Sequence, residues 1–229
     1  MTKFQAVLFD CDGVLVDSEP ITNGLLRDML EEQGWNLTPE ACFQHFVGKA
    51  VLDEKLAIEA NTGKPLTETW MTAFRARRNA ALEAHLQAIP NIHSAIEQIH
   101  LSFDGRIACA SGADRLKVEL QLAKVDLMPY FEGRIFSGHE MPRSKPAPDV
   151  YLAAAEAVGV HPSRCAVVED TVTGVMAGVA AGCMVFGYAP HTQATEHAAL
   201  LAAGASHTFT DMLHLPSLLS QKMAQSTFS

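Results

Sequence analysis

A cluster of carboxylates follows the first apolar stretch of the chain. The run "FQAVLF" at 4–9 leads directly into Asp10, Asp12 and Asp17, which all fall within eight residues. Like charges next to a buried strand repel one another and are costly to bury. This crowding of acidic side chains therefore predicts a site where a bound positive charge relieves the repulsion.

Other polar residues end further apolar runs. Ser111 closes "RIACAS", and Glu169 and Asp170 close "CAVVED", while Lys145 lies in "RSKPAPDVY" just before a predicted helix. In an open parallel sheet, ligands bind outside the carboxyl ends of the strands. We therefore expect these residues, although distant in sequence, to share one rim of a sheet with Asp10.

Such a rim predicts phosphoryl chemistry. Carboxylate oxygens are the ligands that a hard cation such as Mg²⁺ prefers. Lys145 adds a positive charge, and Ser111 with the amides of Gly112 and Ala113 adds donors at an expected helix N-terminus, where anions bind. Together these groups could stabilise the charge that develops on a transferring phosphoryl group.

The elements that must position these residues alternate along the chain. Apolar runs typical of buried parallel strands lie at 5–10, 106–111, 133–138, 165–170 and 183–188. Helical patterns lie between the later runs at 113–125, 148–160 and 173–182, and 207–223 suggests one more short strand and a last helix. This alternation predicts an α/β fold with a doubly wound, Rossmann-like parallel sheet.

One region interrupts the alternation. Between the first and second strand runs the sequence carries apolar residues at helical spacing instead of a second strand. We expect a helical insertion at 18–84, and an α/β core formed by 1–17 and 85–229.

Composition limits the partners. The formal net charge of -9 argues against binding to a nucleic-acid backbone, and no apolar run is long enough to cross a bilayer. The five cysteines lack CxxC spacing and are expected to be reduced thiols of a cytoplasmic protein. We expect a monomer that acts on a small phosphorylated metabolite, without nucleic-acid or membrane partners.

Four segments, taken in order, resemble a known family. "DCDGVLVDSE", "ASG", "SKPAPDVY" and "VVEDTVTG" are similar to the four motifs of the haloacid dehalogenase superfamily of phosphotransferases, and the resemblance covers nearly the whole chain. It implies that Asp10 is the nucleophile that forms an aspartyl-phosphate and that Asp12 is the general acid and base. Ser111 and Lys145 would bind the phosphoryl group, with Gly112 beside them.

The same resemblance implies a cofactor. Asp10, the backbone carbonyl of Asp12, and Asp170 would hold Mg²⁺, with Mn²⁺ or Co²⁺ as possible substitutes. Glu169 would be a further ligand or would contact one. Dehalogenases proper lack the second aspartate of the first motif, so Asp12 favours phosphoryl chemistry over dehalogenation.

The predicted insertion resembles the four-helix cap of this superfamily, which closes over small substrates. Gly48 and Lys49 align with the loop of the cap that determines substrate specificity, and Lys49 is the candidate contact to a distal hydroxyl or carboxylate. Phosphorylated sugar acids such as 6-phosphogluconate, and hexose phosphates, are the leading substrates, and nucleoside monophosphates stay open. Arg75, Arg77 and Arg78 are interpreted as a solvated helix face, although Arg75 and Arg78 could share a face toward the cleft.

Two alternatives remain at this point. Mutases of the β-phosphoglucomutase kind carry a histidine shortly after the first motif, where this chain has Thr22, and this difference favours a phosphatase. A non-catalytic receiver domain also pairs acidic residues with a lysine at strand ends. Receivers lack a helical cap and an acid placed like Asp12, so they are the weaker alternative.

Overall fold

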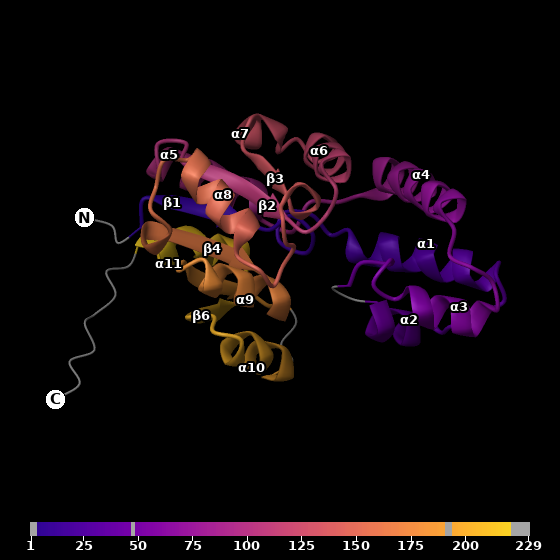
Figure 1. The fold of residues 1–229 in the computed structure, drawn as a ribbon. Coiled ribbons are helices and arrows are strands. Elements are labelled where there is room, and N and C mark those ends of the chain that lie inside the picture. Colours follow the sequence, from indigo (N-terminus) through magenta and orange to yellow (C-terminus); the bar gives the residue numbers. More distant parts are fainter. Residues whose placement is uncertain (1–3, 47–48, 191–193, 221–229) are drawn as a thin grey trace. The chain divides into compact units, whose positions relative to one another are not determined.

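The computed structural model describes residues 4–46, 49–190 and 194–220, and the chain divides into two compact units (Figure 1). An α/β unit comprises 1–16 and 88–229, and a helical unit comprises 17–87. The helical unit thus begins and ends within a few residues of the insertion expected at 18–84.

The α/β unit contains one parallel sheet, as predicted. Its described strands follow the order β3-β2-β1-β4-β5-β6, so the chain order reverses on either side of β1. Every apolar run predicted as a strand forms one, and the short strand expected near the C-terminus is also present. The strands are β1 (Ala6–Phe9), β2 (Ile107–Ser111), β3 (Ile135–Ser137), β4 (Cys165–Glu169), β5 (Met184–Tyr188) and β6 (His207–Phe209).

Helices cover both faces of this sheet, which explains why its strands are apolar throughout. Ala6 and Leu8 of β1 pack into one core layer with Val150 and Tyr151, whereas Phe9 points to the other face and contacts the ring of Phe131. The helices are α5 (Ile92–Ser102), α6 (Arg115–Lys124), α7 (Met128–Phe131), α8 (Asp149–Ala157), α9 (Val172–Ala180), α10 (Ala194–Ala202) and α11 (Leu215–Ser220), with short 3₁₀ turns η1 (Gly138–Glu140), η2 (Pro162–Arg164) and η3 (Met212–His214). Two of them, α7 and α10, lie outside the patterns predicted as helices.

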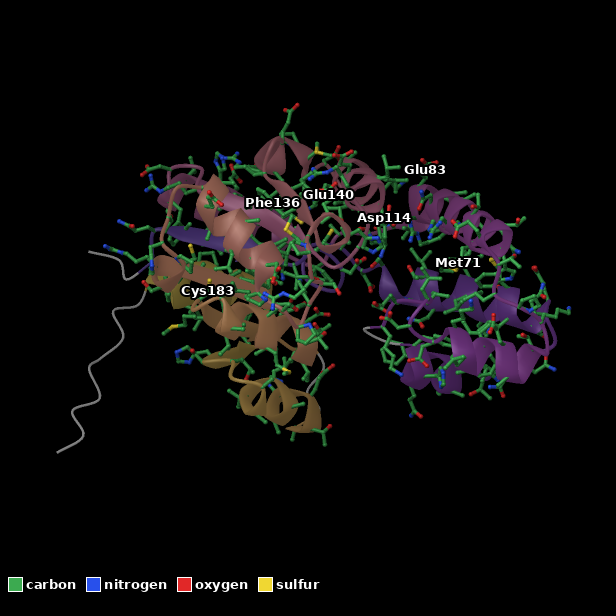
Figure 2. All side chains as sticks on the ribbon, in the orientation of Figure 1. Met71, Glu83, Asp114, Phe136, Glu140 and Cys183 are labelled. Carbon is green, nitrogen blue, oxygen red and sulfur yellow. The ribbon has the colours of Figure 1, made fainter. Side chains whose placement is uncertain are left out.

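One helix begins later than expected. The carboxylate of Asp114, labelled in Figure 2, accepts a hydrogen bond from the amide of Lys117 and so caps α6 at Arg115. The amides of Gly112 and Ala113 therefore lie in the loop before the helix. They lie directly before the capping residue, next to the helix N-terminus where they were expected, although the helix begins at Arg115 and not at Ala113.

The helical unit has an apolar core of its own. Its helices are α1 (Glu19–Glu31), α2 (Pro39–Phe46), α3 (Lys55–Thr62) and α4 (Glu68–His85). Leu26 and Leu30 of α1 pack with Phe46 of α2 and with Met71 and Phe74 of α4, and Met71 is labelled in Figure 2. The helical periodicity of this stretch is therefore the signature of four helices around a shared core.

Two expectations from composition can be compared with the structure. None of the described helices is both long enough and apolar enough to cross a bilayer. All five cysteines are free thiols and are buried.

Candidate active site

The acidic residues meet at the carboxyl ends of β1 and β4. β1 pairs with β4 so that Phe9 lies opposite Val168, and the amide of Asp10 donates to the carbonyl of Val168 over 3.0 Å. Asp10, which follows β1, and Glu169, the last residue of β4, therefore lie side by side at this edge of the sheet. This is the switch point of the sheet, where an open α/β fold binds its ligand.

Lys145 lies among these carboxylates. Its ammonium group donates over 2.6 Å to Asp10 Oδ1 and over 2.6 Å to Glu169 Oε1. It also reaches the carbonyl of Ala110 at 3.0 Å and the hydroxyl of Tyr151 at 3.1 Å. Burial by itself would lower the pKa of Lys145, but the charges of Asp10 and Glu169 outweigh it and hold that pKa above its usual value. The lysine is therefore a fixed positive charge beside Asp10.

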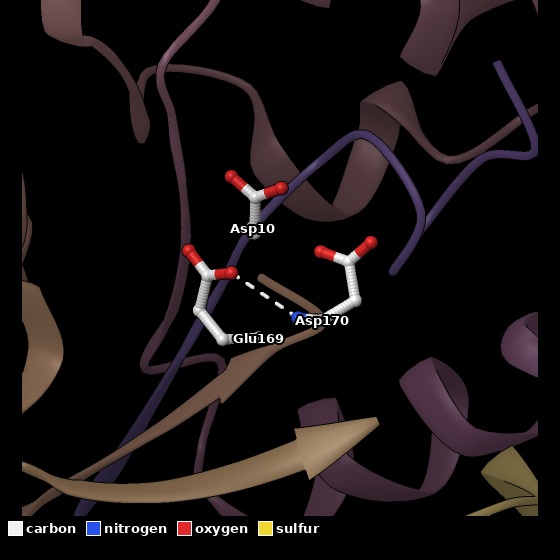
Figure 3. Close-up of side chains that lie close together, drawn as sticks. All are labelled: Asp10, Glu169 and Asp170. Atoms are coloured by element: carbon white, nitrogen blue, oxygen red, sulfur yellow. Dashed lines mark hydrogen bonds between the residues drawn. The ribbon is translucent and has the colours of Figure 1, made fainter. Parts of the chain in front are cut away.

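Glu169 is wholly buried, and both of its oxygens are bound by the chain. Tyr151 donates its hydroxyl to Oε1 over 2.7 Å, next to the bond from Lys145. Oε2 accepts from the amide of Asp170 at 3.1 Å, which is the dashed line in Figure 3, and from the amide and hydroxyl of Thr171. Glu169 thus fixes both Lys145 and the turn that carries Asp170.

Three carboxylates lie close enough together that they could hold a cation (Figure 3). Asp10, Glu169 and Asp170 each offer an oxygen, and these oxygens lie within 4.8 Å of one another. Gly13 has φ +76°, and a Cβ there would lie 1.9 Å from Asp170 Oδ2. The turn after β1 therefore leaves room for the Asp170 carboxylate only because residue 13 has no side chain. An oxygen-only set of this kind fits Mg²⁺.

Burial gives Asp10 an unusual proton affinity. Burial raises the pKa of its carboxyl to about 7, and the nearby charges of Glu169 and Asp12 act in the same direction, against the lowering effect of Lys145. Lysine alone does not hold the Asp10 carboxylate fully ionised at neutral pH. A second positive charge would complete the site.

Asp12 lies on the same turn but is held by a different element. Its Oδ1 accepts from the ammonium of Lys117 at 2.8 Å and from the amide of Gln121 at 2.7 Å. Both donors come from α6, more than a hundred residues along the chain. The sequence analysis missed Lys117 and Gln121, and also Tyr151. In the sequence, these residues are indicated only by the occurrence of polar side chains at helical spacing on a helix face that is otherwise apolar.

The loop after β2 is shaped by serine hydroxyls. Ser111 is buried, and its Oγ accepts from the amide of Ala113 at 3.0 Å. Ser137, at the end of β3, donates to the carbonyl of Ala113 at 2.6 Å. Gly112 between them is exposed. The loop therefore presents Gly112 at the same rim of the sheet, with Ser111 beneath it.

The residues predicted for specificity lie in the helical unit. Gly48 lies outside the described residues. Lys49 is half-exposed and forms an ion pair with Glu54 at 2.9 Å, and its hydrogen bond lowers the pKa of that carboxyl. Thr22 is part of α1.

The three arginines do not share one environment. Arg75 pairs with Glu68 at 2.7 Å and Arg77 with Glu32 at 2.9 Å, both on the exposed surface. Arg78 is buried instead, and its guanidinium reaches Asn79. The interpretation as a solvated helix face therefore holds for Arg75 and Arg77 and was wrong for Arg78.

Comparison with known proteins identifies the family. Residues 4–182 match the haloacid dehalogenase-like hydrolases. The chain is 30% identical over 221 residues to 6-phosphogluconate phosphatase of Escherichia coli (strain K12), which covers 95% of this chain and 96% of that protein. It is 29% identical over 202 residues to a phosphorylated carbohydrates phosphatase of Thermotoga maritima, covering 88% and 92% of the two chains.

A solved structure agrees. A HAD family hydrolase from Deinococcus radiodurans, crystallised with bound phosphate and sodium, has a TM-score of 0.75 and 30% identity, and the match covers 97% of this chain and all of that one (100%). Membership in a hydrolase family excludes the non-catalytic receiver. The chain belongs to the haloacid dehalogenase-like hydrolases and is a phosphatase.

Proposed function

We propose that this phosphatase hydrolyses small phosphorylated sugars or sugar acids, such as 6-phosphogluconate or hexose phosphates. The reaction depends on Mg²⁺ and passes through an aspartyl-phosphate, an acyl phosphate formed on Asp10. The observation that carries the proposal is the buried ammonium group of Lys145, held between Asp10 and Glu169 at 2.6 Å from each. It places one fixed positive charge at the nucleophile and leaves further negative charge to be balanced.

The charges of the site support a divalent cation. Asp10, Asp12, Glu169 and Asp170 contribute four carboxylates, and Lys145 and Lys117 contribute two ammonium groups. The formal balance is two negative charges, which one divalent cation neutralises. Asp10, the backbone carbonyl of Asp12, and Asp170 would hold Mg²⁺. When bound, it supplies charge neutralisation for the phosphoryl oxygens and keeps Asp10 ionised.

The residues of the chain can then carry two displacements. A carboxylate oxygen of Asp10 attacks phosphorus, and the bond from phosphorus to the sugar oxygen breaks as Asp12 gives that oxygen a proton. A water molecule then attacks the phosphorus, Asp12 takes the proton from the water, and the bond from phosphorus to the Asp10 oxygen breaks to release inorganic phosphate. Lys145 and Ser111 bind the phosphoryl oxygens in both steps.

The substrate class rests on the relatives and on the helical unit. Both relatives named above are phosphatases whose names specify phosphorylated sugars or sugar acids. Lys49 offers a half-exposed cation that is already paired with Glu54. A carboxylate or hydroxyl of the substrate would replace Glu54 as the partner of the Lys49 ammonium group. This favours polyhydroxylated anions over neutral alcohols as substrates.

A phosphate-release screen tests the proposal. The purified protein is assayed with Mg²⁺ or with EDTA against 6-phosphogluconate, hexose phosphates, pentose phosphates and nucleoside monophosphates. We expect release that requires Mg²⁺, is fastest on sugar acids or sugars, and is lost in Asp10→Asn. Release that persists in EDTA, or near-normal turnover by Asp10→Asn, would refute the mechanism.

The same experiment distinguishes hydrolysis from a mutase reaction, in which the phosphoryl group is returned to the sugar. A mutase would give an isomerised sugar phosphate and would need a bisphosphate activator, whereas a phosphatase gives inorganic phosphate. Thr22 stands where the mutase histidine is expected, so we predict inorganic phosphate as the product.

A further inference from the structure

Two side chains of α6 hold the Asp12 carboxylate. Lys117 and Gln121 lie four residues apart on one face of the helix, one turn from each other. Lys117 Nζ donates at 2.8 Å and Gln121 Nε2 at 2.7 Å, and both bonds fall on the same oxygen, Oδ1. The other end of the Gln121 amide is also fixed, because its Oε1 accepts from the thiol of Cys11 at 3.5 Å. The network therefore defines which end of the amide faces Asp12.

Burying either of these polar side chains costs stability that an apolar residue would not cost. Gln121 is fully buried and Lys117 is 8% exposed, and buried polar groups destabilise a fold unless every one is bonded. Lys117 is also the third residue of α6, where the helix dipole disfavours a cation. Apolar side chains would fill the same face without these penalties, so the burial and bonding of these two residues indicate a role in the chemistry of Asp12.

We propose that Lys117 and Gln121 are positioning residues that fix the Asp12 carboxylate through Oδ1 and thereby assign proton transfer to Oδ2. Because Oδ1 accepts two hydrogen bonds, the proton that Asp12 gives to the leaving oxygen is carried on Oδ2. After the bond from phosphorus to the leaving oxygen breaks, the same Oδ2 takes the proton from water. This inference rests on the function proposed above.

The assignment makes a selective prediction. An alkyl phosphate such as a sugar phosphate needs a proton on its leaving oxygen, whereas 2,4-dinitrophenyl phosphate releases a stable anion and needs none. Misplacing Asp12 should therefore slow the first kind of substrate and spare the second. General acid–base catalysis contributes roughly 100- to 10,000-fold, so partial misplacement should cost roughly 10- to 100-fold.

The experiment measures kcat/KM with saturating Mg²⁺ over a series of phosphate esters, from an alkyl phosphate through phenyl phosphate to 2,4-dinitrophenyl phosphate. The variants are Lys117→Met and Gln121→Leu, and Lys124→Met is the matched control, because Lys124 is an exposed lysine on the same helix. We expect Lys117→Met and Gln121→Leu to lose roughly 10- to 100-fold on the alkyl ester and less than about threefold on the dinitrophenyl ester. Lys124→Met should stay within about twofold on both.

A double-mutant cycle separates positioning from general damage. If Lys117 acts through Asp12, then Lys117→Met should change nothing further in an Asp12→Ala protein. Equal losses across the ester series, or a full additional loss in the Asp12→Ala background, would overturn the proposal. Should Lys117→Met fail to fold, Gln121→Leu and a Lys117→Arg rescue carry the same comparison.

The outcomes also distinguish this inference from the proposed function. A wild-type protein that releases no phosphate from any ester with Mg²⁺ overturns both. An active wild-type protein whose Lys117→Met and Gln121→Leu variants keep its full leaving-group dependence overturns the positioning role alone.

Discussion

Replacing Gly13 by alanine tests how the turn after β1 and the Asp170 carboxylate depend on each other. A Cβ at this position would lie 1.9 Å from Asp170 Oδ2, whereas ordinary contact begins at 3.4 Å. The oxygen must therefore retreat by about 1.5 Å, which is the difference between these two distances. Gly13→Ala also places an L residue at φ +76°, which costs about 1–2 kcal/mol of stability.

Gly133 provides the control for the backbone term. It has φ +73° and belongs to the same α/β unit, but nothing lies within 4 Å of its virtual Cβ. Gly133→Ala should therefore carry the same cost of about 1–2 kcal/mol without disturbing a carboxylate. Any difference between the two variants reports the displacement of Asp170.

The assay is phosphate release titrated with Mg²⁺, alongside thermal unfolding. A 1 Å misplacement of a catalytic group can cost roughly 100-fold in rate, so we expect Gly13→Ala to lose roughly 10- to 100-fold in kcat/KM and to need more Mg²⁺ for half-maximal rate. Gly133→Ala should keep the wild-type Mg²⁺ dependence. If Gly13→Ala and Gly133→Ala require the same Mg²⁺ concentration, then Asp170 is not part of the cation site.

Three further changes probe the site and its surroundings. In EDTA at pH 8, Asp10→Asn should be more stable than the wild type by up to about 4 kcal/mol and should unfold at a higher temperature. The reason is that burial raises the pKa of Asp10 to about 7, so the ionised carboxylate destabilises the folded wild-type protein at this pH. The folded pKa lies above the unfolded one, so this difference should grow between about pH 4 and pH 7 and vanish in acid; a constant difference from pH 4 to pH 8 would contradict it. Tyr151→Phe removes the 2.7 Å bond to Glu169 and should cost about 1–3 kcal/mol in chemical denaturation, and an unchanged midpoint would show that the bond contributes nothing. Lys49→Ala should lower kcat/KM on 6-phosphogluconate more than on phenyl phosphate, whereas equal losses on both would argue against a role in specificity.

Much of the core fold could be predicted because its signals are local. Each strand of the sheet is a short apolar run, since both faces of a parallel sheet are covered, and such runs can be read without knowing their partners. Asp10 and Asp170 could be placed near each other on the same grounds, because the carboxyl ends of parallel strands meet at one edge. The start of α6 was misplaced because a single capping residue, Asp114, decided it.

The partners of the site residues could not be predicted in the same way. Lys117 and Gln121 meet Asp12 across more than a hundred residues, and Tyr151 meets Glu169 from a different helix. Whether a polar residue on a helix faces solvent or a buried carboxylate depends on how the helix is rotated against the sheet. Arg78 shows the same limit, because it is buried although Arg75 is partly exposed and Arg77 is exposed.

The sequence by itself determined which residue types stand at the ends of the strands, and therefore that carboxylates, a serine and a lysine are available for phosphoryl chemistry. Only the tertiary structure decided which charges pair: Lys145 between Asp10 and Glu169, and Lys117 on Asp12. The physical reason is the separation along the chain of the residues that interact. Strand and helix patterns arise from neighbours along the chain, whereas a hydrogen bond to a buried carboxylate depends on the packing of whole elements that the local pattern does not encode.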